Sequence, residues 1–218
     1  VGMSLDGRTA MASGESQWIT GAAARHEVHQ WRARSCAILT GIGTLLHDDP
    51  ALTARLDNYN GLQPLRVIAD TEGRTPPAAQ TLQLPGKVVL ACGPDAAAYL
   101  QQHEVCGSGL QADCTVMPVP LLNGKLNLKT LLQQLASDLQ CNEVWVEAGP
   151  TLVGALLQAG LVDELVTYIA PALLGERARP LAALPGLERL ADKVSLHFVD
   201  VAMVGEDCRI RSLVLPRA

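Results

Sequence analysis

The sequence predicts an α/β fold, with a mostly parallel central sheet flanked by helices and a C-terminal antiparallel hairpin. Short apolar strands alternate with helix-like segments along most of the 218 residues, a pattern typical of parallel sheets covered on both faces. Two late strands, 194–204 and 207–215, are joined through Gly205-Glu206, which favours a hairpin. The length suits one α/β domain of generous size better than two small ones, so we expect a single domain over residues 1–218.

The individual elements follow from local patterns. Thr20 is a suitable N-cap for the first long helix, and Asn127 for a later one. Asp48-Asp49-Pro50 ends a short helix, because the residue before a proline avoids helical backbone angles. Residues 75–86 contain prolines and are expected to be irregular. The expected strands are 9–12, 36–40, 65–69, 87–92, 114–117, 143–148 and 165–170, and the expected longer helices are 21–34, 95–103, 127–139 and 151–159.

The stretch from Glu143 to Gly160 combines a strand, a tight turn and a helix. Gly149-Pro150 breaks the strand pattern, and Gly160 ends the apolar helix. Such a turn presents free backbone N–H groups and the positive end of the helix dipole, which suits an anion and most often a phosphate. Glu147 stands at the strand end beside it. From these residues alone, an anion site and an ordinary β-α connection are equally good interpretations.

The composition argues against several kinds of partner. A net charge of −5 and few aromatic residues (three Trp, three Tyr and one Phe) argue against nucleic-acid binding. No apolar run reaches the roughly 18 residues that cross a bilayer, and no signal peptide opens the chain, so no membrane partner is expected. The six scattered cysteines form no C-x-x-C pair and are expected to be reduced and mostly structural, which fits the cytoplasm.

Other catalytic chemistries find weak support. The histidines of His26-Glu27-Val28-His29 are three residues apart rather than four and no third ligand is in view, so we interpret them as a solvated helix face and expect no metal. The H-x-E and P-C-x-x-C motifs of zinc deaminases are missing from the sequence. Ser16 lacks the second glycine of a nucleophile elbow.

Ligands of parallel sheets bind beyond the C-terminal ends of the strands. This rule places four segments on one rim: 4–8, 41–48, 70–74 and 149–151. Arg32 lies at the end of the first helix and Arg55 follows the Asp-Asp-Pro corner. Two arginines facing one pocket would clamp a phosphorylated ligand. Taken singly, each arginine is better explained as a surface residue.

Six motifs are specific as a set and span most of the chain. They are S-L-D-G-R-T-A from Ser4, G-E-S-Q-W-I-T from Gly14, G-x-x-T-L-L-x-D-D-P-x-L-T-x-R from Gly41 to Arg55, V-E-A-G-P-T-L from Val146, G-L-V-D-E-L from Gly160 and P-A-L-L-G from Pro171. Together they closely resemble the reductase domain of the bifunctional riboflavin-biosynthesis deaminase–reductase family. The resemblance implies a dihydrofolate-reductase-like fold, and residues 75–139 carry little of it.

The resemblance also implies NADPH-dependent reduction of 5-amino-6-(5-phosphoribosylamino)uracil, a phosphorylated pyrimidine of riboflavin biosynthesis. Hydride would pass from the nicotinamide to C1′ of the ring-opened sugar, while the protein supplies placement and charge. Carried over position by position, the family pattern places the substrate against Ser16, Arg32, Leu52, Arg55 and Glu147. It places the cofactor against Gly2, Trp18, Thr44, Asp48, Thr71, Gly149, Pro150, Thr151, Leu152, Val153, Gly154 and Ala155.

The residue types at these positions suit the implied ligands. The N–H groups of residues 149–151 suit a pyrophosphate, and Ser16, Arg32 and Arg55 suit a sugar phosphate. Glu147 can accept hydrogen bonds from the pyrimidine or the ribityl group. Thr71, with Arg74 nearby, suits an adenosine 2′-phosphate and would favour NADPH over NADH.

Several points stay open at this stage. Asp48 and Glu147 are the candidates for a catalytic acid, although reduction of a protonated imine needs little acid help. Family members usually carry a basic residue, typically Lys, just before position 1, and often a zinc deaminase domain upstream; the abrupt start suggests a fragment without either.

The alternatives are a reductase of another pteridine or pyrimidine, and a nucleotide-binding or dimerisation module inactive through truncation. The apolar content and the family both suggest a homodimer.

Overall fold

The computed structural model describes residues 1–103, 105–107 and 109–216, and the chain forms two compact units. The first unit comprises residues 1–28 and 149–218, and the second comprises residues 29–148. Helix α1 (Ala22–Arg34) contributes residues to both, while every other element belongs to one. The single domain expected over the whole chain stays a prediction.

The second unit is built on a fully parallel sheet of five strands in the order β6-β5-β4-β3-β9. These strands are β3 (Ala37–Gly41), β4 (Leu65–Ala69), β5 (Gly86–Cys92), β6 (Ala112–Pro118) and β9 (Val144–Val146). The other elements of this unit are α2 (Ile42–Asp48), α3 (Gln80–Gln83), α4 (Pro94–Gln102), α5 (Leu128–Leu139), β7 (Leu121–Leu122) and β8 (Lys125–Leu126). The predicted parallel sheet is therefore confirmed.

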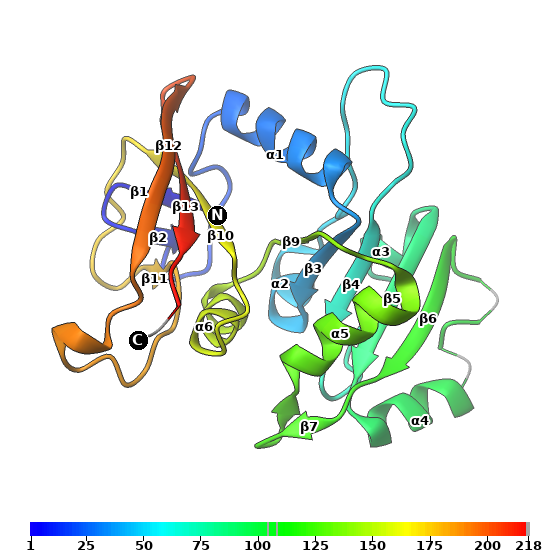
Figure 1. Cartoon of the computed structure of the whole chain (residues 1–218). Helices are drawn as coiled ribbons and strands as arrows, with labels where there is room; N and C mark the ends of the chain where they lie inside the picture. The colour runs from blue at the N-terminus through cyan, green and yellow to red at the C-terminus, as the bar shows by residue number, and fades with distance from the viewer. Residues whose placement is uncertain (104, 108, 217–218) are drawn as a thin grey trace. The chain divides into compact units, whose positions relative to one another are not determined.

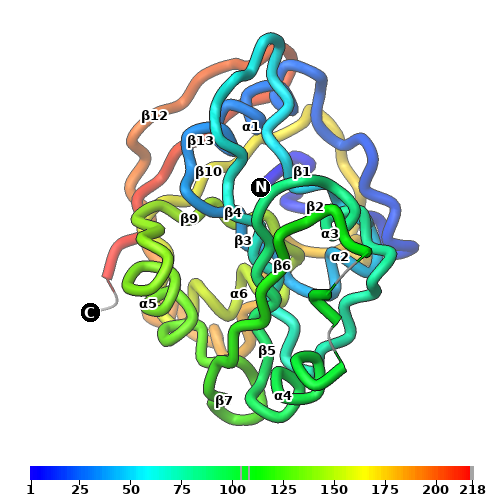
Figure 2. Tube along the Cα trace, turned by 90° about the vertical axis from the view of Figure 1, so that its right-hand side faces the viewer, coloured from blue at the N-terminus to red at the C-terminus, as the bar shows by residue number. Residues whose placement is uncertain are grey.

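Helices cover both faces of this parallel sheet. The chain places β3 to β6 in one direction and then returns to place β9 beside β3. Because such crossovers are right-handed, the return puts α5 on the face opposite α2, α3 and α4, an arrangement visible in Figure 2. One cluster of buried apolar side chains joins α2, α3 and α4 to β4 and β5. Leu131 and Leu135 of α5 are fully buried as well, which explains the near-continuous apolar sequence of the central strands.

The first unit contains a sheet of order β1-β10-β13-β12. β1 (Gly2–Ser4) runs parallel to β10 (Glu164–Ala170), and β13 (Asp207–Val214) pairs antiparallel with both β10 and β12 (Leu196–Val204). β12 and β13, orange and red in Figure 1, are the predicted C-terminal hairpin, which is confirmed. The remaining elements of the unit are the pair β2 (Arg8–Ala10) and β11 (Arg179–Pro180), helix α6 (Pro150–Gln158) and the 3-10 turn η1 (Leu190–Asp192).

Two local expectations were wrong. The four segments expected on one rim do not all follow strands of one sheet, because residues 4–8 follow β1, which belongs to the sheet of the first unit. Residues 75–86 are not wholly irregular, because they contain α3. The buried Arg66 of β4 donates hydrogen bonds to the carbonyl oxygens of Thr81 (2.7 Å) and Leu84 (3.0 Å). This short helix is thus stabilised by a buried residue of the preceding strand, which no local pattern reveals.

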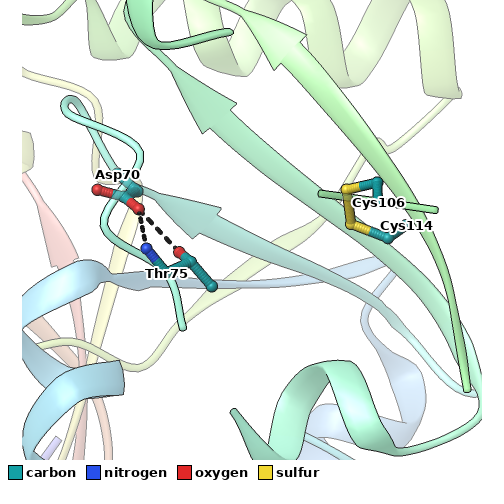
Figure 3. The surroundings of a disulfide bond; sticks show 4 residues. All are labelled: Asp70, Thr75, Cys106 and Cys114. Atoms are coloured by element: carbon teal, nitrogen blue, oxygen red, sulfur yellow. Dashed lines mark hydrogen bonds between the residues drawn. A yellow bond between two sulfur atoms is a disulfide. The ribbon is translucent and has the colours of Figure 1, made fainter. Parts of the chain in front are cut away.

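The expectation of six reduced cysteines was also wrong at one pair. Cys106 and Cys114 form a disulfide, with their Cα atoms 5.0 Å apart, and it ties the segment after α4 to β6 (Figure 3). The other four cysteines carry free thiols. The spacing of eight residues matches no redox or metal motif, so the pair could not be recognised from the sequence.

Within the described ranges, no helix of the chain is both long and apolar enough to span a membrane.

Candidate functional site

An ion pair between Arg32 and Glu147 is the centre of the candidate site in the second unit. The Arg32 guanidinium donates from Nε to Oε1 and from Nη2 to Oε2 of Glu147, both at 2.6 Å. The indole Nε1 of Trp145 donates to the same Oε1 at 2.8 Å. The two charged side chains are 12% and 23% exposed, so little water screens the pair. The sequence named both residues as substrate contacts, and the structure brings them together.

The electrostatics of the pair fix the charge of Glu147. Burial alone would raise the pKa of Glu147, but the hydrogen bonds and charge of Arg32, with the indole of Trp145, lower it below its usual value. The same partner raises the pKa of Arg32 although burial opposes this. Glu147 is therefore a carboxylate at neutral pH, able to accept hydrogen bonds and unable to donate a proton.

An aromatic stack holds the end of α1 against β9. The Trp31 and Trp145 rings are parallel within 1°, with centroids 5.2 Å apart, and the Arg34 guanidinium carbon lies 4.3 Å from the Trp31 ring centroid. Offset stacking and cation–π contacts each add about 0.5–1.5 kcal/mol beyond area burial. Trp31 directly precedes Arg32, and Trp145 lies two residues before Glu147. The stack therefore fixes both partners of the ion pair.

The segment Thr53–Arg55 has no regular secondary structure, but side chains hold its backbone at every residue. Arg32 Nη1 donates to the Thr53 carbonyl at 3.0 Å. The Gln63 amide accepts from Ala54 N and donates to Ala54 O, both at 2.9 Å. The Arg55 N–H donates to Nδ1 of His29 at 3.2 Å. The side chain of Arg55 remains exposed, so this predicted phosphate contact projects from a fixed backbone.

Leu52, another predicted substrate contact, has an unusual backbone. Its φ of 50° lies in the left-handed region, which a bulky residue rarely adopts. The residue is only 1% exposed, so burial holds it in this conformation. Such strain is found most often at functional segments, and here it directs the chain into the held Thr53–Arg55 segment.

The predicted cofactor contacts of the second unit follow two neighbouring strands. Thr44 and Asp48 lie on α2, directly after β3, and Thr71 follows β4. Since β3 and β4 are adjacent and parallel, these residues share one edge of the sheet. Asp48 is exposed, and its Oδ1 lies 2.8 Å from His47 Nδ1.

The turn after β4 is closed by the buried Asp70. Its Oδ2 accepts from Thr75 N at 2.7 Å and from Thr75 Oγ1 at 2.8 Å (Figure 3). This closure holds Thr71 at the strand end. Arg74, suggested above for an adenosine phosphate, is exposed and forms an ion pair of 3.3 Å with Glu72.

The predicted pyrophosphate segment, Gly149 to Ala155, lies in the first unit. Gly149 is the N-cap of α6 and Pro150 occupies its first turn, with no side-chain hydrogen bond to the cap. Backbone N–H groups of this first turn suit an anion. Gly154 has a packing role, because a Cβ there would lie 2.0 Å from the carbonyl oxygen of Ala183. Gly149, Thr151 and Leu152 lie at the start of α6, where the anion contact is predicted, and Gly154 allows the helix to pack closely against Ala183.

The other predicted contacts in the first unit precede α1. Trp18 is 67% exposed, and the guanidinium carbon of Arg25 lies 4.6 Å from its ring centroid. Ser16 opens a turn in which its carbonyl accepts from Ile19 N at 3.2 Å. Gly2 packs against Thr20, whose methyl carbon would be 3.2 Å from a Cβ at position 2. An exposed indole and a small residue suit contact with a flat cofactor ring.

Within the second unit, the structure gathers the predicted residues in two sets. Arg32, Leu52, Arg55 and Glu147 form one set, and Thr44, Asp48 and Thr71 stand on one edge of the same sheet. The sequence missed His29, Gln63 and Trp145, which hold this set in place. The one available signal was that His29 lies one helical turn before Arg32, on the same side of α1.

The chain contains a parallel sheet flanked by helices in one unit and an antiparallel strand pair in the other, the features expected of a dihydrofolate-reductase-like enzyme. Residues 1–210 match the family described as the RibD C-terminal domain, and the chain belongs to that family. It is 47% identical over 218 residues to the riboflavin biosynthesis protein RibD of Escherichia coli, covering 95% of this chain and 56% of that protein. The chain therefore spans about half the length of that relative.

Two further relatives are informative. A protein of Buchnera aphidicola (from Acyrthosiphon pisum) named 5-amino-6-(5-phosphoribosylamino)uracil reductase is 32% identical, covering 92% of this chain and 97% of its own length. The solved structure of Acinetobacter baumannii RibD, form 2, superposes with a TM-score of 0.84 at 39% identity, covering 99% of this chain and 56% of that one. The fold predicted from the sequence is therefore confirmed.

Proposed function

We propose that the chain reduces 5-amino-6-(5-phosphoribosylamino)uracil to its ribityl product, with NADPH as the hydride donor. Family membership supports a reductase, and the Buchnera relative of nearly the same length bears the name of this activity. The observation that carries the proposal is the Arg32–Glu147 pair beside the held Thr53–Arg55 segment. It combines a fixed anion, a fixed cation and an exposed arginine, as a polar, phosphorylated substrate requires.

Each group of the substrate set has a proposed role. Arg55, with Ser16, binds the phosphate of the substrate. Glu147, held ionised by Arg32 and Trp145, accepts hydrogen bonds from N–H or hydroxyl groups of the substrate. Arg32 holds Glu147 and the Thr53 carbonyl at once, so it couples recognition of the polar groups to the position of Arg55. These contacts orient the C1′ carbon, which must be presented in a near-attack geometry.

The cofactor residues have separate roles. A bound nicotinamide supplies the hydride, and the protein sets its position. The first turn of α6 binds the pyrophosphate through backbone N–H groups, since Gly149 brings no side chain to the cap. Trp18, Gly2, Thr44 and Asp48 contact the cofactor, and Thr71 with Arg74 favours the 2′-phosphate of NADPH.

Proton delivery is assigned by charge. Glu147 is ionised and serves as an acceptor. Asp48 is the remaining candidate acid among the predicted residues; it is exposed and paired with His47. Because a protonated imine is already electrophilic, its reduction needs little general acid catalysis from either carboxylate.

Absorbance at the nicotinamide band tests the proposal. The chain, supplied with NADPH and the phosphoribosylaminouracil, should oxidise the cofactor, and with NADH it should do so much more slowly. Dihydrofolate should neither replace nor compete with the substrate. Binding of NADPH without any oxidation would reject the activity, and competition by dihydrofolate would indicate a reductase of a different pteridine.

We also propose that the chain forms a homodimer. β12 stands at the end of its sheet, and it exposes Phe198 (60%), Val201 (57%) and Met203 (67%). Apolar side chains on an edge strand favour association. Sedimentation equilibrium should give twice the monomer mass, and Val201→Lys should shift the equilibrium to the monomer; a wild-type monomer at micromolar concentration would contradict the proposal.

A further inference from the structure

The backbone of Thr53–Arg55 is held from two directions. His29 and Arg32, one turn apart on α1, contact its two ends, at Arg55 N and Thr53 O. Gln63 holds both polar groups of Ala54 between them. A segment without helix or strand normally satisfies its backbone with water. Here four of its backbone groups have side-chain partners, so the segment has the order of a regular element.

This arrangement fixes where the Arg55 side chain begins. The side chain is exposed and would sample many rotamers, but its Cα cannot shift without breaking the His29 contact and the neighbouring Gln63 contacts. Pre-organisation of this kind lowers the ordering cost when a ligand binds. The contact from His29 reaches Arg55 itself, which makes it the most direct of the three.

We propose that His29 is a positioning residue for the substrate: its Nδ1 accepts the Arg55 N–H and so sets the place from which the Arg55 guanidinium binds the substrate phosphate. Gln63 supports the same segment through Ala54. The inference rests on the proposed function, because it assigns Arg55 to the substrate. His29 touches no reacting atom in this assignment and acts only through Arg55.

The charge state of His29 agrees with this geometry. An acceptor at Nδ1 requires the neutral ring with its proton on Nε2. The charged groups that face His29 are Arg32, Arg55 and Glu147, together with the Thr53 carbonyl. Burial, followed by the charges of Arg32 and Arg55, lowers the pKa of His29, and these outweigh the opposite effects of Glu147 and Thr53. The neutral acceptor is thus the form present at physiological pH.

Three variants of the full chain test the proposal. His29→Ala removes the acceptor, and His29→Asn restores one, because the Asn Oδ1 occupies about the position of the His Nδ1. His26→Ala is the matched control, since His26 is an exposed histidine one turn earlier on the same helix. Two readouts apply to each variant. The first is hydrogen exchange of the Arg55 amide by NMR, and the second is kcat and KM for the phosphoribosylaminouracil and for NADPH.

The expected signature separates positioning from folding. In His29→Ala, the Arg55 amide should exchange faster, and KM for the substrate should rise about fivefold to twentyfold, the effect of losing one hydrogen bond and local order. kcat and KM for NADPH should stay within about twofold, as for uniform binding loss. His29→Asn should recover most of both changes, and His26→Ala should match the wild type.

Several results would overturn the proposal. One is an Arg55 amide that exchanges equally fast in the wild type and in His29→Ala; another is an equal rise of KM for both ligands. If His29→Ala fails to fold, Gln63→Ala must show the same selective rise of KM, and its absence rejects the positioning role. If the wild type does not oxidise NADPH, the proposed function fails by itself. The positioning role is then decided by Arg55 amide exchange and by NMR titration with ribose 5-phosphate, which must bind His29→Ala more weakly than the wild type.

Discussion

Arg32 and Glu147 are 115 positions apart in the sequence and are joined by two parallel hydrogen bonds of 2.6 Å. Arg32 lies in the last turn of α1 and Glu147 follows β9, so the ion pair joins the C-terminal end of α1 to the end of β9. The two opposite charges pair with one another, and both side chains are largely shielded from water. Removing one partner therefore leaves a charge that is both unpaired and partly buried.

A double-mutant cycle measures this coupling. Glu147→Gln should lower the free energy of unfolding by about 2–4 kcal/mol, because Arg32 loses its counter-charge. The double variant Arg32→Met, Glu147→Gln should lose less than the sum of the single losses, by about 1–3 kcal/mol. Urea unfolding, followed by circular dichroism, gives the change in the free energy of unfolding for Arg32→Met, for Glu147→Gln and for the double variant. Additive effects would show that the two side chains do not stabilise one another in solution.

Gly154→Ala tests the packing role of this glycine. A Cβ at Gly154 would lie 2.0 Å from the carbonyl oxygen of Ala183, so the helix α6 must shift. We expect a loss of about 1–3 kcal/mol in the free energy of unfolding and weaker NADPH binding by fluorescence titration. Gly43→Ala is the control, since no heavy atom lies within 4 Å of a Cβ there, and alanine should stabilise that helix slightly. A Gly154→Ala variant as stable as the wild type would contradict the placement of residue 183.

The loss of stability at acid pH should reveal the contribution of the Asp6 carboxylate. The Ser4 hydroxyl, followed by the N–H groups of Leu174 and Gly175, lowers the pKa of Asp6 from 3.8 to about 2, although burial opposes them. A lowered folded-state pKa stabilises the protein above the unfolded value, and this stabilisation is lost as pH falls through the folded value. The melting temperature of Asp6→Asn should therefore lie below that of the wild type above about pH 4.

The difference between Asp6→Asn and the wild type should narrow between about pH 4 and pH 2. Differential scanning calorimetry across this window checks the trend. Asp57→Asn, at an exposed loop position, should follow the wild type throughout. A constant gap between Asp6→Asn and the wild type would show that the Asp6 carboxylate is not held as described.

Reduction of the disulfide should destabilise the second unit. Cys106 and Cys114 close a loop with a sequence separation of 8, and constraint of such a loop is worth about 2–3 kcal/mol. A reductant should therefore lower the urea midpoint of the wild type. The Cys106→Ser, Cys114→Ser variant should match the reduced protein and ignore the reductant. Six reactive thiols in the denatured, unreduced wild type would contradict the disulfide.

Local patterns predicted much of the fold. β4 has the predicted bounds Leu65–Ala69, and Asn127 caps α5 by accepting from Thr130 N at 3.2 Å. What failed depends on distant partners. β1 joins β10 through pairing across the whole chain, and α3 depends on Arg66. Strand sequences alone do not state which sheet a strand enters, and a four-residue helix has no periodicity to detect.

The candidate site shows the same division. The resemblance to a family named Arg32, Leu52, Arg55 and Glu147 one by one, but nothing in the sequence stated that Arg32 binds Glu147. His29 was interpreted as a solvated residue, because its acceptor role exists only once the Arg55 backbone is beside it. Gln63 contacts a backbone nine positions away and matches no local capping pattern, so it could not be found from the sequence either.

The strand order β6-β5-β4-β3-β9 has a consequence for synthesis on the ribosome. β3, β4, β5 and β6 pair with sequence neighbours, so each can join the sheet soon after it emerges. β9 pairs with β3 only after the chain has passed α5, and Glu147 arrives with it. Arg32 therefore lacks its counter-charge, Glu147, until the last strand of the parallel sheet has been synthesised. The Arg32–Glu147 ion pair therefore forms late in synthesis, after the other four strands of the parallel sheet have been made.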